Sequence, residues 1–155
     1  PRTIPSIMIL NFTIRMAVLL LVLLSSLSMS ACNRPNFDPK LAMPPYPYEL
    51  HTTNVIPIQV FRDGTHIEIV NSTDNSWSDL TVWINQRFAA KLSQLPAGQR
   101  VSMNLFDFRD DLGEQFRAGG LLRTRPAAKV ELVELQSGLE QPLVGLISVM
   151  PGKGQ

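Results

Sequence analysis

The sequence predicts an all-β protein, with a single antiparallel β-sandwich of about seven strands placed after a signal peptide and a proline-rich tether. From Val55 onward, apolar residues recur at every second position in short runs, as they do along strands with one buried face. Turn-forming segments such as Asp63-Gly64 and Pro96-Ala97-Gly98 separate these runs. The 3.6-residue period of an amphipathic helix is not evident there. A small barrel is the alternative arrangement.

The first predicted strands form hairpins. Alternation up to Asp63-Gly64 and again beyond it predicts one hairpin, and Asn85-Gln86 offers the turn of a second. The predicted strands occupy residues 55–61, 66–70, 80–85, 87–92, 100–105, 128–138 and 142–150.

The last two runs depart from simple alternation. In residues 128–138 the alternation slips at Leu132-Val133, which predicts a bulge or an edge. The run from Pro142 to Met150 is apolar at both parities, and it therefore predicts a central strand covered on both faces.

Residues 1–31 have the pattern of a secretory signal peptide. An apolar core, Met16 to Leu24, follows Arg15 and is shorter than the roughly 20 residues that a membrane-spanning helix needs. Small residues then lead to Cys32, the only cysteine in the chain. Met8 is a better translation start than Pro1.

The segment Met29-Ser30-Ala31-Cys32 resembles the lipobox of bacterial lipoproteins, although the family usually has Leu or a similar aliphatic residue in place of Met29. The resemblance implies that the signal peptidase recognises Met29, Ser30 and Ala31. It also implies that Cys32 carries a thioether-linked diacylglycerol and becomes the new N-terminus. An ordinary cleaved signal and an uncleaved anchor are the alternatives.

The same resemblance predicts where the protein resides. In lipoproteins of two-membrane bacteria, an Asp after the lipidated cysteine commonly retains the protein in the inner membrane, whereas this chain has Asn33. We therefore expect a protein of the bacterial cell envelope, attached to the membrane through lipid on Cys32, in the outer membrane and facing the periplasm.

Residues 32–50 are predicted to comprise the lipidated cysteine and a proline-rich tether, with the β-sandwich domain at 51–155. Prolines fix φ and remove backbone donors, so residues 33–50 are not expected to form a regular helix or sheet. Extended as polyproline, this segment would reach roughly 55 Å. A proline-rich ligand for an aromatic groove is the alternative interpretation.

The charge of the chain argues against nucleic acid as a partner. Removing residues 1–31 removes Arg2, Arg15 and no acidic residue, so the balance of 14 basic and 13 acidic residues becomes 12 and 13. A nearly neutral mature protein lacks the basic surface that binding to phosphates requires.

The region from Gly64 to Leu105 is similar to the small immunoglobulin-like domains of exported bacterial proteins, loosely those of the FxLYD type. A strand ending in Asn71, a polar loop, a second strand and a Pro-Gly turn into a third carry the resemblance. The Phe-x-Leu-Tyr-Asp signature and the inter-sheet cysteine pair of antibody domains are missing. The resemblance implies an immunoglobulin-like sandwich of uncharacterised role.

Few residues suggest chemistry. His51 and His66 lie far from other metal-ligating residues of suitable spacing, and ordinary surface histidines are expected. No set of nucleophile, base and orienting residue is evident, so the sequence predicts neither an enzyme nor a cofactor.

One acidic cluster, in residues 106–116, is a candidate calcium or hydrolase site, because carboxylates that converge on one point are what a hard cation needs. The alternative is a solvated loop that three phenylalanines fix to the core and whose acids pair with Arg109 or Arg117. The acidic residues are Asp107, Asp110, Asp111 and Glu114. The phenylalanines are Phe106, Phe108 and Phe116.

Two tryptophans are candidate binding residues. Trp83 lies on the face opposite Leu80, Val82 and Ile84, where it either packs in the structure or forms an exposed platform for a sugar or a protein. Trp77 falls in a polar loop and is a candidate exposed contact. Together these features predict an exported, lipid-anchored, non-catalytic binding or structural module with an envelope protein or glycan as its partner.

Overall fold

The computed structural model describes residues 37–120 and 125–149, which belong to a compact unit spanning Pro35–Gln155. The predicted signal peptide, its recognition residues 29–31 and Cys32 lie outside the described residues. Three short 3-10 helices, η2 (Pro39–Leu41), η3 (Tyr48–Leu50) and η4 (Leu105–Asp107), accompany the strands. The strands are β1 (Val55–Asp63), β2 (His66–Asn71), β3 (Trp77–Ile84), β4 (Phe88–Leu95), β5 (Arg100–Asn104), β6 (Val133–Ser137) and β7 (Val144–Val149). The all-β prediction is confirmed.

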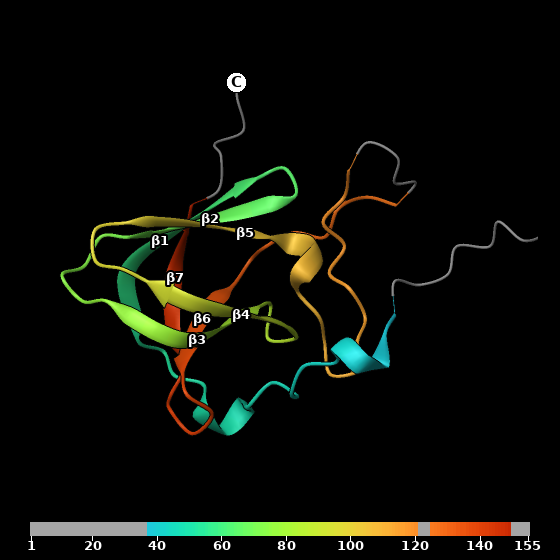
Figure 1. Cartoon of the computed structure of the whole chain (residues 1–155), viewed down its shortest axis with the longest axis horizontal. Coiled ribbons are helices and arrows are strands. Elements are labelled where there is room, and N and C mark those ends of the chain that lie inside the picture. The colour runs from blue at the N-terminus through green and yellow to red at the C-terminus, as the bar shows by residue number, and fades with distance from the viewer. Residues whose placement is uncertain (1–36, 121–124, 150–155) are drawn as a thin grey trace, which may run out of the picture. The chain divides into compact units, whose positions relative to one another are not determined.

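The strands form one mixed sheet in the order β4-β3-β6-β7-β1-β2-β5 (Figure 1). The predicted antiparallel arrangement holds for every neighbouring pair except β1 and β7, which are parallel. This parallel pair joins two antiparallel halves, β4-β3-β6-β7 and β1-β2-β5.

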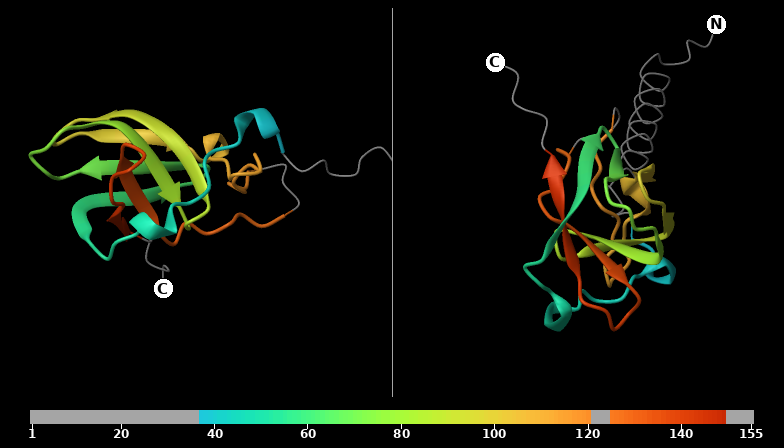
Figure 2. Two further views of the ribbon diagram at one scale, coloured as in Figure 1. Left: turned by 90° about the horizontal axis from the view of Figure 1, so that it is seen from below. Right: turned by 90° about the vertical axis from the view of Figure 1, so that its left-hand side faces the viewer.

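The two halves cross at an angle and enclose the main core between them (Figure 2). Alternating residues of β1, β2 and β3 supply much of this core, as the period-two pattern predicts. They include Ile58, Val60, Ile67, Ile69, Leu80, Val82 and Ile84. Phe108 and Phe116, from the acidic loop, complete the core, as predicted.

The predicted turns contain residues with positive φ, two of which, Gly64 and Asn85, are of types that adopt it readily. Gly64 (φ 55°) lies in the β1–β2 turn, where Asp63 pairs with His66. Asn85 and Gln86 both have positive φ in the turn from β3 to β4, and the Arg87 N–H donates to the Ile84 carbonyl. Both predicted hairpins are present.

The two departures from alternation have different outcomes. The slip at Leu132-Val133 marks the start of β6, and β6 lies between β3 and β7 rather than at an edge. The prediction of a bulge or an edge there was wrong, because the Asn85 side chain, and not a strand, accepts the N–H groups of Glu131 and Leu132. The predicted central position of the last strand is confirmed, since β7 lies between β6 and β1, but the strand is not covered on both faces, because Ile147 is 43 % exposed.

The proline-rich segment packs against the domain. Residues 37–51 contact the loop at 110–114 and then the outer face of β3 and β6, where Tyr46 is buried. The free tether predicted for residues 32–50 is therefore wrong for its described part, 37–50, and the packed domain begins before residue 51. Within the described residues, the longest helices are single 3-10 turns, and none could cross a membrane.

Candidate functional site

A groove of about 500 Å³ lies between β4 and β5, the two strands at the ends of the sheet order. In Figure 1 both strands are yellow and run next to each other on the near side of the domain. The apolar floor of the groove is formed by Leu41, Met43, Ala90, Leu92 and Met103, and its polar groups come from Lys91, Ser93, Ser102, Asn104, Asp107 and Arg109. The groove is the open seam of the sandwich.

Main-chain groups face this groove. The N–H and C=O of Ala89 pair with Arg109 on the side of β4 away from β3, so by alternation those of Lys91 and Ser93 also point away from β3. Directly after β5, the N–H of Leu105 donates to the Thr65 carbonyl on the β2 side. Because main-chain groups alternate along a strand, those of Asn104 and Ser102 point away from β2.

The two edges differ in how far they are covered. The start of β4 is paired with Arg109 through the isolated bridge at Ala89. Within the described residues, β5 has β2 as its only strand neighbour and no isolated bridge. An edge with outward main-chain groups is a template for another extended segment, and β5 offers such an edge along its whole length.

The acidic loop does not gather its carboxylates. Asp107 and Asp111 are exposed, whereas Asp110 is fully buried and hydrogen-bonds to Arg87 through Oδ2 (3.1 and 2.8 Å). Its Oδ1 accepts the backbone N–H groups of Leu112 and Glu114 (3.1 and 2.7 Å).

These bonds are structural. Burial alone would raise the pKa of Asp110, but the Arg87 hydrogen bond and the two backbone donors together hold that pKa below its ordinary value. Within the described part of the chain, no three His, Cys, Asp or Glu residues are placed to hold a metal ion. The structure thus does not gather the four acids of the candidate calcium or hydrolase site, Asp107, Asp110, Asp111 and Glu114, at one point, and the buried one already binds Arg87 and its own loop.

A second buried carboxylate lies on the outer face of β6. Glu134 is 1 % exposed, and both of its oxygens accept hydrogen bonds from the Tyr46 hydroxyl (3.0 and 2.8 Å). The half-exposed His51 contacts the same carboxylate through Nδ1 (2.8 Å). His51 is thus not the ordinary surface histidine that its sequence context predicts.

This cluster fastens the N-terminal segment to the sheet. Burial, followed by the hydrogen bond to Glu134 and its charge, raises the pKa of Tyr46 above the ordinary value of 10.0, so the hydroxyl stays protonated and donates. Sequence reasoning missed the cluster because Glu134 lies at the polar parity of β6, which predicts a solvent-facing position. The one sequence feature that pointed to the cluster was Tyr46, an aromatic residue in a proline-rich segment that otherwise has the composition of a spacer.

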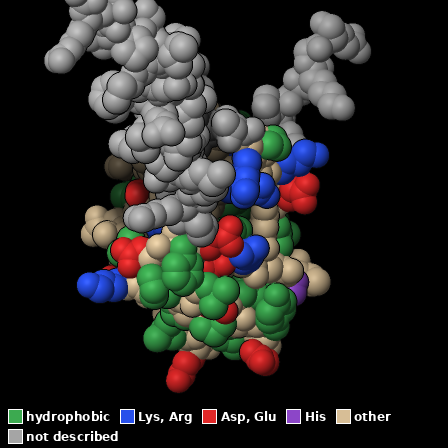
Figure 3. All heavy atoms as spheres, turned by 90° about the vertical axis from the view of Figure 1, so that its right-hand side faces the viewer, with side chains coloured by type: hydrophobic (Ala, Val, Ile, Leu, Met, Phe, Trp, Pro, Cys, Tyr) green, Lys and Arg blue, Asp and Glu red, His purple; other side chains and the backbone are tan. Residues whose placement is uncertain are grey.

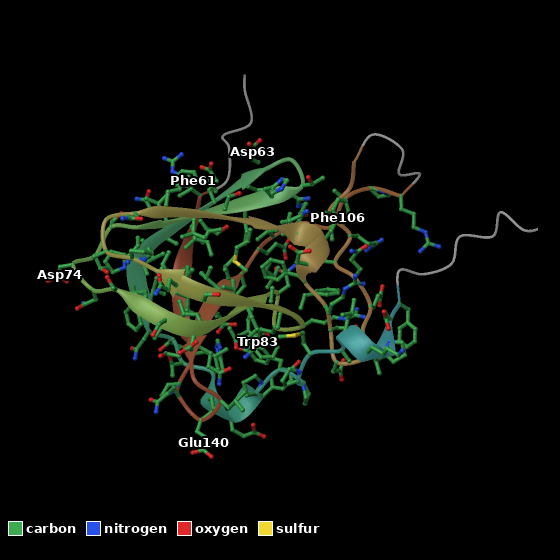
Figure 4. The ribbon with its side chains drawn as sticks, viewed as in Figure 1. Phe61, Asp63, Asp74, Trp83, Phe106 and Glu140 are labelled. Carbon is green, nitrogen blue, oxygen red and sulfur yellow. The ribbon has the colours of Figure 1, made fainter. Side chains whose placement is uncertain are left out.

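The two tryptophans are packed in the structure. Trp83 is 2 % exposed, donates to the Gln136 side chain (3.1 Å) and meets Tyr46 edge to face. Figure 4 shows Trp83 on the side of the sheet that residues 43–51 cover. Trp77 begins β3 and packs partly buried against the main core, with its indole nitrogen buried. The packing alternative for Trp83 is therefore confirmed, whereas Trp77 is partly buried and not the exposed contact that its polar loop predicted.

The fold and the open groove define the chain as a small β-sandwich with an uncovered sheet edge. Comparison with protein families, with curated proteins and with solved structures finds no match for the chain.

Proposed function

We propose that the protein is an exported, lipid-anchored bacterial envelope protein whose β-sandwich is a non-catalytic module that binds an extended polypeptide segment of an envelope partner. The observation that carries this proposal is the groove between β4 and β5, where main-chain groups of two sheet edges flank an apolar floor. A strand that enters such a groove gains main-chain hydrogen bonds along its length and places alternate side chains on the floor.

A peptide fits this surface better than the glycan that the sequence also suggested. Sugar binding commonly uses an exposed aromatic face, but Trp83 is buried and Trp77 packs against the core. The groove instead offers the exposed Leu41 and the half-buried Met43, which lie over Leu92 and Met103 at the surface of the main core. Flexible, polarisable methionine adapts to varied apolar partners.

The anchor rests on the leader sequence. The apolar core, the small residues before the single cysteine and Asn33 after it support lipidation of Cys32 and residence in the outer membrane. The mass of the mature N-terminal peptide, from a bacterium that processes lipoproteins, tests this part. We expect a lipid-modified Cys32 that is absent in Cys32→Ser, whereas an unmodified N-terminus or retention of residues before Cys32 would contradict the anchor.

Photo-crosslinking in intact cells tests the groove. A photoreactive amino acid at Ser93 or Ser102, both exposed on the groove wall, is expected to form an adduct with an extended segment of another envelope protein. The control position is Asp74, in the β2–β3 loop at the far end of the domain (Figure 4). Equal adducts at all three positions, or none at Ser93 and Ser102, would contradict a binding groove.

A further inference from the structure

Three large hydrophobic side chains project from one corner of the domain. Phe37 is 51 % exposed, Leu41 is 50 % exposed and Leu112 is 61 % exposed. We call these three residues the entry patch, because they lie where the described chain begins. Single exposed hydrophobic residues are ordinary, but several on one platform indicate a contact surface.

The two segments that carry the entry patch are bonded to each other. Phe37 forms an antiparallel bridge with Glu114, and the Asp38 N–H donates to the Gly113 carbonyl (3.1 Å). The Met43 N–H donates to the Asp110 carbonyl (3.0 Å). The buried ion pair of Asp110 with Arg87 fixes the loop from below. The patch is thus presented by a fixed platform rather than by a loose loop.

We infer that the entry patch docks onto the lipid surface to which Cys32 is attached, an inference that rests on the proposed lipidation of Cys32. Phe37 follows Cys32 by five residues, so fully extended chain can separate their Cα atoms by at most about 18 Å. A lipid on Cys32 would therefore keep the patch within reach of the bilayer surface. Because residues 37–43 are bonded to the loop at 110–114, this limit brings Leu112 and the domain close to the bilayer as well, which a free tether would not do.

The charges around the patch are weakly acidic. Asp38, Asp110, Asp111 and Glu114 lie beside Lys40 and Arg87, and Arg87 pairs with both Asp110 and Glu114 (2.8 and 2.6 Å). Figure 3 shows this side of the domain, with hydrophobic side chains gathered in the lower half of the view and acidic and basic ones beside them. The contact is therefore expected to depend on apolar insertion at the interface and only weakly on anionic lipid.

The test uses the mature lipidated protein in vesicles of phosphatidylethanolamine and phosphatidylglycerol. The thioether blocks the sulfur of Cys32, so a single introduced cysteine can carry a fluorophore. Leu112→Cys reports on the patch, and Leu139→Cys, at a similarly exposed leucine (69 %) in the β6–β7 turn, is the matched control. Nitroxide-labelled lipids should quench the fluorophore at 112 at least about threefold more than the one at 139.

A second variant separates docking from mere proximity. Phe37→Ser, at an exposed site outside the groove, should leave the melting temperature nearly unchanged and lower quenching at 112 toward the level at 139. Unchanged quenching in this variant would overturn the inference.

The remaining outcomes separate the inference from the proposed function. If mass spectrometry finds lipid on Cys32 but 112 and 139 are quenched equally, the docking inference fails while the lipoprotein proposal stands. If the fluorophore at 112 is protected from quenching by aqueous iodide and is also not quenched by the nitroxide-labelled lipids, protein covers the patch and the inference fails. If Cys32 carries no lipid, both the lipoprotein proposal and the docking inference fail.

Discussion

Two buried carboxylates, Asp110 and Glu134, show how single polar residues hold irregular chain in place on this small domain. Burying a carboxylate is unfavourable unless charged or hydrogen-bonding groups surround it. Asp110 binds Arg87 and two N–H groups of its own loop, and Glu134 binds Tyr46 and His51. Each pairing fixes a segment that has no strand ladder of its own.

Asp110→Asn is expected to lower the free energy of unfolding by about 2 kcal/mol, because it removes a charged partner from Arg87 and a charged acceptor from the loop. The pH dependence should also change. The pKa of Asp110 is lowered in the folded state, so its contribution is present above the ordinary value of 3.8 and is lost as pH falls toward the folded value. Denaturant unfolding between pH 2.5 and 6 measures both effects.

The exposed neighbour provides the control for this prediction. Asp111→Asn should change the free energy of unfolding by less than about 0.5 kcal/mol at neutral pH. An Asp110→Asn protein that loses stability with acid as steeply as the wild type would show that Asp110 is not the titrating group.

Tyr46→Phe is expected to cost about 1–3 kcal/mol, because Glu134 would remain buried without its hydroxyl donor. The folded pKa of Tyr46 is raised, so its contribution is present below the ordinary pKa of 10.0 and is lost as pH rises above it. Denaturant unfolding at pH 7 and at pH 10–11 tests both points. Tyr48→Phe is the control, since Tyr48 is 69 % exposed and should be nearly neutral; equal effects of the two changes would be evidence against the cluster.

At the level of elements, residues 37–51 act as a clip that covers the outer face of β3 and β6. This cover explains why both faces of β3 are buried from Leu80 to Ile84, although the sequence places aliphatic residues on only one of those faces. Tyr46, Met43 and Leu50 pack around Trp83 in the smaller core. The Trp83 indole, which the sequence offered as a candidate ligand platform, is thereby enclosed.

The clip depends on a close approach at Gly113. This residue has φ +84°, and a Cβ added there would overlap the Asp38 carbonyl group. Gly113→Ala is therefore expected to destabilise the domain by at least about 1 kcal/mol more than Gly98→Ala, whose φ is also positive (+65°) but whose surroundings are open. Hydrogen exchange at the amides of Asp38 and Met43 should accelerate in Gly113→Ala alone. Equal acceleration in both variants would contradict the close approach.

The sequence predicted the elements that form through local rules and missed the contacts that join distant segments. Period-two alternation and turn residues were enough to predict seven strands and the hairpins at Gly64 and Asn85. The proline content of residues 37–50 excluded long helices but carried no information about docking. The pairs Tyr46–Glu134 and Arg87–Asp110 join residues 88 and 23 positions apart, so spacing could not reveal them.

At the scale of the whole molecule, strand pairing closes the sandwich on one side and leaves it open on the other. The parallel β1–β7 pair joins the two halves of the sandwich, whereas β4 and β5 flank the groove without pairing. Soluble proteins usually protect such edges, because they can recruit other strands. A retained open edge with an apolar floor is consistent with the binding role that we propose.

A pair of proline substitutions on β5 tests whether a strand adds to this edge. The main-chain N–H of Ser102 points away from β2, so Ser102→Pro removes a donor that the sheet does not use and should cost less than about 1 kcal/mol. The neighbouring Val101 donates toward β2, so Val101→Pro should cost about 2 kcal/mol or more. Denaturant unfolding measures this difference. Ser102→Pro should also abolish the adduct formed from Ser93, because a partner strand would lose its hydrogen bond to β5. A folded Ser102→Pro protein that still forms the adduct would mean that the partner binds the groove without pairing to β5.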